Sequence, residues 1–197
     1  MEQTRSRRDF NRYLIDYHPF TIDKALTQMI TIETITTVKS YPIEVLPITC
    51  YIYDYLLAKG ETNIAQHYDL SPFSIPVQTL DRTFIDKVFA LADYYISGKI
   101  TGHSRHIYDL YKIYPKISFD DTFINLVKEI RNIRKSFSTC YSAFDGIDIS
   151  LLLHNIITEN TYSNDYEQNT TQLLYEELPY CQAIKVLTSI IDDGCFA

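Results

Sequence analysis

The chain has 197 residues, 46% of them hydrophobic and 22% charged, so it is not a disordered tail and can bury a core. Its net charge is -7, which excludes bulk binding of DNA by overall charge and leaves only local basic patches for nucleic acid. The start MEQTRSRRDF has no signal-peptide core, and no run reaches the roughly 20 apolar residues of a membrane span. We expect a cytoplasmic protein without membrane contact, with its four cysteines reduced because no C-x-x-C pair occurs.

The first part of the chain carries strand patterns. Apolar and polar residues alternate over 12–17, and the run 30–38 is rich in β-branched residues, so both segments predict strands, with Glu33 on one face of the second. The remaining elements predicted for this part are a tyrosine-rich helix at 48–59, a short helix at 62–67 and a short strand at 77–79. The proline-flanked segment 42–47 and the segment 71–76 are predicted to be connectors.

Two amphipathic helices follow residue 80. Apolar residues recur at helical spacing in each, at Ile85, Val88, Phe89 and Ala92 and then at Ile107, Leu110, Tyr111 and Tyr114. Asp81 and Ser104 stand where N-caps are expected. On the second helix Arg105, Asp109 and Lys112 share one polar side, and Lys87 projects from the first.

The rest of the chain predicts further helices. These are a helix at 120–137 with a basic face (Lys128, Arg131, Arg134 and Lys135), a short helix at 148–158, a polar interruption at 160–169 and two closing helices at 171–177 and 180–192. Composition therefore divides the chain into a strand-bearing part, 1–80, and a helical part, 81–197. We predict an α+β fold in which a small N-terminal sheet packs on a larger C-terminal helical bundle.

The central stretch resembles a known family. Arg82 to Lys87 reads R-T-F-x-x-K, and Ser104 to Tyr111 reads S-R-H-I-Y-D-L-Y. Together they look like the second half of the AbiEii/AbiGii-type nucleotidyltransferase toxins, which belong to the polymerase-β-like nucleotidyltransferase superfamily. The resemblance implies a bacterial toxin of a toxin–antitoxin or abortive-infection system. Such an enzyme transfers a nucleotide from a nucleoside triphosphate to an RNA (tRNA) or protein acceptor, and has an antitoxin partner.

The resemblance also implies roles for individual residues. Lys87 would contact the nucleotide phosphates, and Asp109 would be the carboxylate of the family's later motif, with Arg105 nearby to bind phosphate. Glu33 would be a ligand of the metal ion, Mg²⁺. Arg131, on the basic face, is a further candidate for phosphate oxygens.

One part of the family pattern is missing from this sequence. The family opens with a Gly-Gly or Gly-Ser turn followed by a D-x-D motif, and the chain has neither. Transfer of a nucleotide depends on Mg²⁺ held by converging carboxylates, which Glu33 alone does not supply. We therefore expect a truncated or incomplete form, with doubtful Mg²⁺ binding by this chain alone.

Two other interpretations stay open. The first is that Arg105, Asp109 and Lys112 form a solvated lattice of ion pairs without a functional role. His103 and His106 do not indicate a metal site, because no third ligand stands at metal spacing. The alternative function is a non-catalytic helical module that binds an antitoxin or a second copy of itself.

Overall fold

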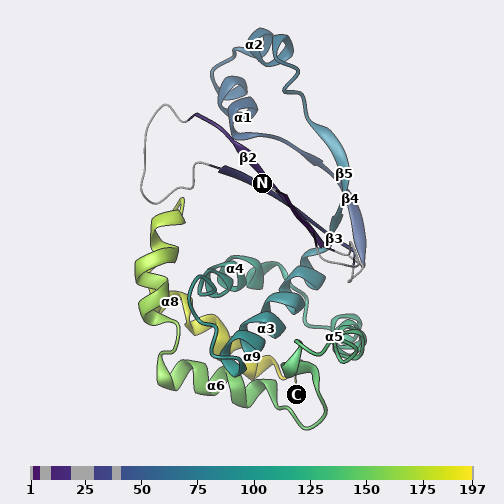
Figure 1. Cartoon of the computed structure of the whole chain (residues 1–197), viewed down its shortest axis with the longest axis vertical. Coiled ribbons are helices and arrows are strands. Elements are labelled where there is room, and N and C mark those ends of the chain that lie inside the picture. Colours follow the sequence, from purple (N-terminus) through teal and green to yellow (C-terminus); the bar gives the residue numbers. More distant parts are fainter. Residues whose placement is uncertain (1, 5–9, 19–28, 37–40, 197) are drawn as a thin grey trace. The chain divides into compact units, whose positions relative to one another are not determined.

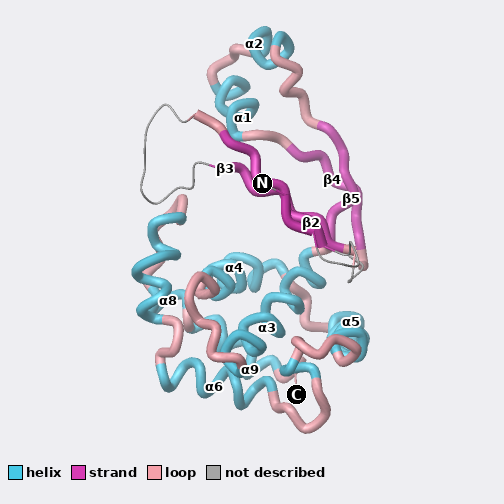
Figure 2. The backbone as a smooth tube through the Cα atoms, viewed as in Figure 1, coloured by secondary structure: helices cyan, strands magenta, loops and turns pink. Residues whose placement is uncertain are grey.

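We analysed a computed structural model of the chain, which describes residues 2–4, 10–18, 29–36 and 41–196 (Figure 1). Contacts between residues divide the chain into two compact units, Met1–Tyr41 and Pro42–Ala197. Figure 2 distinguishes the strands from the helices, and all the described strands precede residue 80, as predicted for an α+β fold. The boundary at residue 80, which follows composition, stays a prediction.

The first unit contains an antiparallel sheet. Its strands β1 (Glu2–Thr4), β2 (Phe10–Asp16) and β3 (Met29–Ile35) lie in the order β1-β2-β3. The strands predicted at 12–17 and 30–38 correspond to β2 and β3, except that residues 37 and 38 lie outside the described part. Arg12 pairs with Glu33 across β2 and β3, and their side chains form an exposed ion pair of 2.6 Å.

The second unit begins with a two-stranded antiparallel sheet. Its strands are β4 (Ile43–Ile48) and β5 (Phe73–Gln78), and the helices α1 (Tyr51–Ala58) and α2 (Thr62–His67) lie between them in the chain. The prediction of connectors at 42–47 and 71–76 is wrong. Pro47 and Pro76 both lie inside strands, and proline is tolerated there because each strand of a two-stranded sheet has one unpaired edge.

Helices form the remainder of this unit. The α-helices are α3 (Leu80–Ile96), α4 (Arg105–Ile113), α5 (Asp121–Arg134), α6 (Ile149–Glu159), α7 (Ser163–Asp165), α8 (Tyr180–Ala183) and α9 (Lys185–Asp193). Short turns are η1 (Tyr114–Lys116), η2 (Tyr141–Ala143), the π-helical η3 (Tyr166–Thr170) and η4 (Thr171–Leu173). No helix in the described ranges is long and apolar enough to cross a membrane.

The core of this unit is built around α3. The helix contacts α4, α5 and α6 and lies among them in Figure 1. Its buried face carries Phe84, Ile85, Val88, Phe89, Leu91 and Ala92, each fully buried. Burying a large apolar side chain contributes about 1.5–3 kcal/mol, so this face fixes the rotation of α3. Because this rotation is fixed, Lys87, on a less buried side of α3, points in a defined direction.

Three local predictions need correction. The N-cap of α3 is Thr79, whose hydroxyl accepts from the amide of Arg82, and not Asp81. The closing helix predicted at 171–177 is only the short turn η4. The predicted polar interruption at 160–169 contains α7 and η3 and buries Tyr162 and Tyr166 completely, because their apolar rings lie four residues apart on one helical face.

Candidate functional site

A buried network of charges holds α3 against its neighbours. Asp86 accepts from Arg82 Nε at 2.8 Å and from Arg134 Nη1 at 3.2 Å. Arg134 Nη2 also donates to Asp93 at 2.8 Å, and Asp93 accepts from the amide and the hydroxyl of Ser142, each at 2.7 Å. Since Arg134 comes from α5 and Ser142 from η2, the network joins three segments. It fixes α3 against α5 and η2.

Lys87 and Asp109 meet across α3 and α4. The Nζ of Lys87 donates to Oδ2 of Asp109 at 2.6 Å, and the side chains are 22% and 35% exposed. Partial exposure means that solvent and ligands can reach both groups. An ammonium of this kind can bind phosphate oxygens, and a carboxylate can accept from a hydroxyl or bind a cation.

His106 lies on α4, three residues before Asp109. Burial, together with the positive charge of Lys87, lowers the pKa of His106 to about 4, against the opposing effect of Asp109. The imidazole is therefore neutral at pH 7. Its ring is nearly parallel to that of Tyr94, with 5.8 Å between centroids, while Tyr94 stacks on His103 at 3.5 Å. A neutral His106 leaves Lys87 and Arg105 as the cations here.

Asp165 fixes the loop that leads into α4. Its carboxylate, 6% exposed, accepts from the amides of Gly102 at 2.7 Å and Ser104 at 3.0 Å and from Nδ2 of Asn169 at 2.7 Å. Burial by itself would raise the pKa of Asp165, but the hydrogen bonds from Ser104, Gly102 and Asn169 outweigh it and lower the pKa. Asp165 is therefore a charged anchor that sets where α4 begins.

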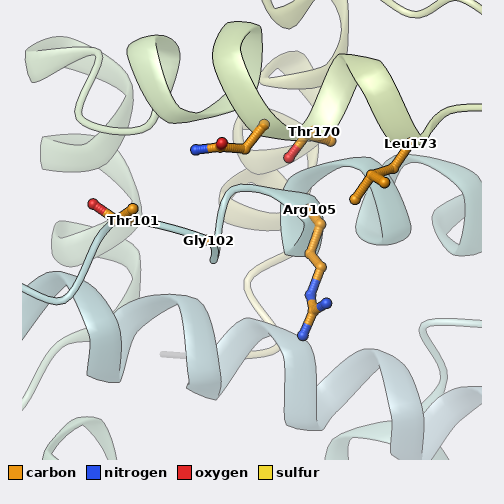
Figure 3. A pocket seen from close by; sticks show the side chains of 6 residues that line it. Thr101, Gly102, Arg105, Thr170 and Leu173 are labelled. Atoms are coloured by element: carbon orange, nitrogen blue, oxygen red, sulfur yellow. The ribbon is translucent and has the colours of Figure 1, made fainter. Parts of the chain in front are cut away.

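A pocket of about 280 Å³ opens beside this loop. Figure 3 shows Thr101 and Gly102 on the loop, Arg105 at the start of α4, and Thr170 and Leu173 on the later segment. Asn169 completes the lining. Within the described ranges Arg105 makes no hydrogen bond or ion pair, so its guanidinium is available to a ligand.

The remaining predicted site residues have partners of their own. Arg131 Nη2 donates to the carbonyl of Phe196 at 2.9 Å, and its guanidinium lies over the Phe89 ring. Lys112 pairs with Glu176 at 2.6 Å and not with Asp109. Glu33 pairs with Arg12 in the other unit, so its role as a metal ligand stays a prediction.

The described residues do not by themselves form a metal site. No three His, Cys, Asp or Glu side chains among them lie close enough together to hold an ion. Asp109 is paired with Lys87, and Glu33 with Arg12. Mg²⁺ takes carboxylate and phosphate oxygens in near-octahedral geometry, which a single free carboxylate oxygen at each place does not provide.

Sequence reasoning missed two parts of this site. The sequence assigns His103 and His106 no role because no third metal ligand accompanies them, whereas in the structure His106 is largely desolvated and feels the charge of Lys87. Asp165 was hidden in the predicted polar interruption. The spacing of Tyr162, Asp165, Tyr166 and Thr170 is helical, and this periodicity could have found it.

These features define an α+β protein whose helical part sets a lysine and a carboxylate side by side next to an arginine-lined pocket, the groups with which proteins bind phosphorylated substrates. The chain belongs to the family described as nucleotidyl transferase AbiEii toxin, Type IV toxin–antitoxin (TA) system, whose model matches residues 2–186. The resemblance drawn from the motifs around Lys87 and Asp109 is confirmed at the level of the family. No curated protein and no solved structure matches the chain.

Proposed function

We propose that the chain carries part of a toxin-type nucleotidyltransferase site, in which Lys87 binds the phosphates of a nucleoside triphosphate and Asp109 orients that lysine. The observation that carries the proposal is the 2.6 Å contact between Lys87 Nζ and Asp109 Oδ2. These residues are 22 apart in the sequence and come from the two motifs that carry the family resemblance. Arg105, on the same helix as Asp109, is the second phosphate ligand.

The chemistry of this reaction needs little from a protein except positioning and neutralisation of charge. Lys87 supplies a positive charge to the phosphates, and Asp109 holds its ammonium in place before the substrate arrives. The acceptor is an RNA, such as a tRNA, or a protein hydroxyl, and an antitoxin is the regulatory partner. Mg²⁺ binding needs more carboxylates than Asp109 alone supplies.

A transfer assay tests this proposal. Each of the four nucleoside triphosphates, labelled on the α-phosphate, is incubated with the chain, Mg²⁺ and bulk RNA or protein. We expect no measurable transfer by the 197-residue chain alone and transfer when a segment with a Gly-Ser turn and a D-x-D motif is supplied. Robust transfer by the chain alone would show that the metal site has been misplaced.

One observation favours a second candidate, a module that binds an antitoxin or a second copy of the chain. The surface of α1 exposes Tyr51 at 92%, Ile52 at 62% and Tyr55 at 62%, and large exposed apolar surfaces are common in binding sites. Sedimentation of the chain over a range of concentrations tests self-association. Dimers that disappear with Tyr51→Ser and Tyr55→Ser would support it, and a monomer at all concentrations would exclude the homodimer.

A further inference from the structure

The pocket beside Arg105 has a lining that suits neither a simple anion nor an apolar ligand. Leu173 supplies an apolar wall, and the hydroxyl of Thr170 is already bonded to Ser104 at 2.7 Å. Gly102, at φ +80°, has no atom within 4 Å of the place where a Cβ would stand. A flat ring can therefore lie close to the backbone there.

The contacts of Asn169 determine which of its side-chain atoms can bind a ligand in the pocket. A carboxylate only accepts hydrogen bonds, so the contact of 2.7 Å between Asn169 and Asp165 holds the amide nitrogen of Asn169 and sets its orientation. In the described part of the chain no group donates to Oδ1 of Asn169, which leaves an acceptor at the pocket. The guanidinium of Arg105 points away from Thr170 and Leu173 (Figure 3), so its donors stay available to the phosphates. A phosphate inside the pocket would be repelled by that amide oxygen.

We infer that this pocket binds the nucleobase of the nucleotide whose phosphates Lys87 holds. A nucleobase has two apolar faces and an edge that carries donors, which match the wall at Leu173 and the acceptor of Asn169. This inference rests on the proposed function and adds to it the place of the base. It assigns no preference among the four bases.

The spacing along α4 fits such a ligand. Arg105 and Asp109 are four residues apart, so they lie on one side of the helix, separated by about 6 Å along its axis. In a nucleotide the base and the phosphates are attached to opposite ends of one sugar. A base in the pocket therefore directs the phosphates along α4 toward Lys87.

Chemical-shift titration of the ¹⁵N-labelled full chain tests the inference. The probes are ATP, GTP, CTP and UTP in turn and inorganic tripolyphosphate, which has phosphates but no base. We expect tripolyphosphate to shift the amides around Lys87 and Asp109. At least one nucleotide should shift those and also the amides of Gly102 and Leu173.

Matched leucine variants sharpen the result. Leu173 and Leu151 are similarly exposed, at 58% and 56%, but only Leu173 lines the pocket. We expect Leu173→Ala to weaken binding of the preferred nucleotide roughly five-fold, because apolar contact with the base is lost, and to leave tripolyphosphate binding unchanged. Leu151→Ala should change neither.

The outcomes separate the two proposals. If nucleotides bind no more tightly than tripolyphosphate, or if Leu173→Ala has no effect, the base pocket is wrong and the phosphate site stands. Shifts at Gly102 and Leu173 with tripolyphosphate would show an anion pocket and would also overturn the inference. If tripolyphosphate binding is absent, or is unchanged in Lys87→Ala, the proposed function fails together with the inference.

Discussion

Lys87 and Asp109 show how a functional contact differs from a stabilising one. Their side chains are 22% and 35% exposed, and ion pairs that water can reach contribute roughly 0–1 kcal/mol to folding. Stability therefore gives little physical reason to bring these two groups together. Their pairing could not be read from spacing, because Asp109 has a nearer cation in Lys112, which instead pairs with Glu176 from a distant segment.

Lys87→Ala should accordingly leave the fold almost unchanged. We expect its free energy of unfolding to fall by less than about 1 kcal/mol, measured by urea denaturation at pH 7, while binding of tripolyphosphate is lost. A loss of several kcal/mol would show that the pair is mainly structural.

His106 should make stability depend on pH. Its pKa is about 4 in the fold, against an ordinary value of 6.5, so between these values the unfolded chain binds more protons. Stability should then fall as the pH falls from about 6.5 to about 4. His106→Gln cannot titrate and should lose less stability between pH 7 and pH 5 than the parent, in urea denaturation at both values. Equal losses would contradict this prediction. Part of the dependence should remain in the variant, because burial also lowers the pKa of His103.

At the scale of elements, helices were easier to predict than strands. The bounds of α2 match the prediction, and α3 and α4 follow from apolar residues at helical spacing. β4 and most of β5 were missed because Pro47 and Pro76 suggested breaks. The loop before α4 was predicted, but its anchor Asp165 was not, because that contact joins residues more than 60 positions apart. Local pattern carries no information about such contacts.

The buried network around α3 gives a prediction at this scale. Asp93→Ala removes the acceptor of Arg134 and of Ser142 and leaves a buried guanidinium without its full set of partners. Breaking a buried pair in this way costs about 3–5 kcal/mol, so we expect a large fall in the urea midpoint. The control is Asp145→Ala, since Asp145 is 90% exposed and its one ion pair among the described residues is with Lys135 at the surface. Similar effects of the two variants would contradict the assigned role of the network.

Asp165 gives a second prediction for an element. Asp165→Ala removes the acceptor of two backbone amides ahead of α4. We expect the amides of Gly102 and Ser104 to exchange with solvent much faster than in the parent, while those in the middle of α3 keep their protection. Unchanged exchange at Gly102 and Ser104 would show that the loop is held by other contacts.

At the scale of the whole molecule, the main hydrophobic core lies entirely within the second unit. The core cluster runs from Phe84 to Phe196, and none of the residues described before position 42 belongs to it. We therefore expect a fragment of residues 42–197 to unfold cooperatively in urea, with a midpoint close to that of the full chain. Circular dichroism measures this transition. A fragment without a cooperative transition would show that the first unit is needed for folding.

The central claim is that Lys87 and Asp109 act on the nucleotide. The direct measurement is nucleotide transfer to RNA or protein by the chain supplied with a segment that carries a D-x-D motif, comparing the parent with single variants. We predict that Lys87→Ala and Asp109→Ala each lower transfer by about 100-fold or more, since charge stabilisation at the phosphates is lost. Lys112→Ala, which removes an exposed ion pair with Glu176 and a contact with the Tyr108 ring, should retain most of the activity. An Asp109→Ala variant as active as the parent would contradict the account.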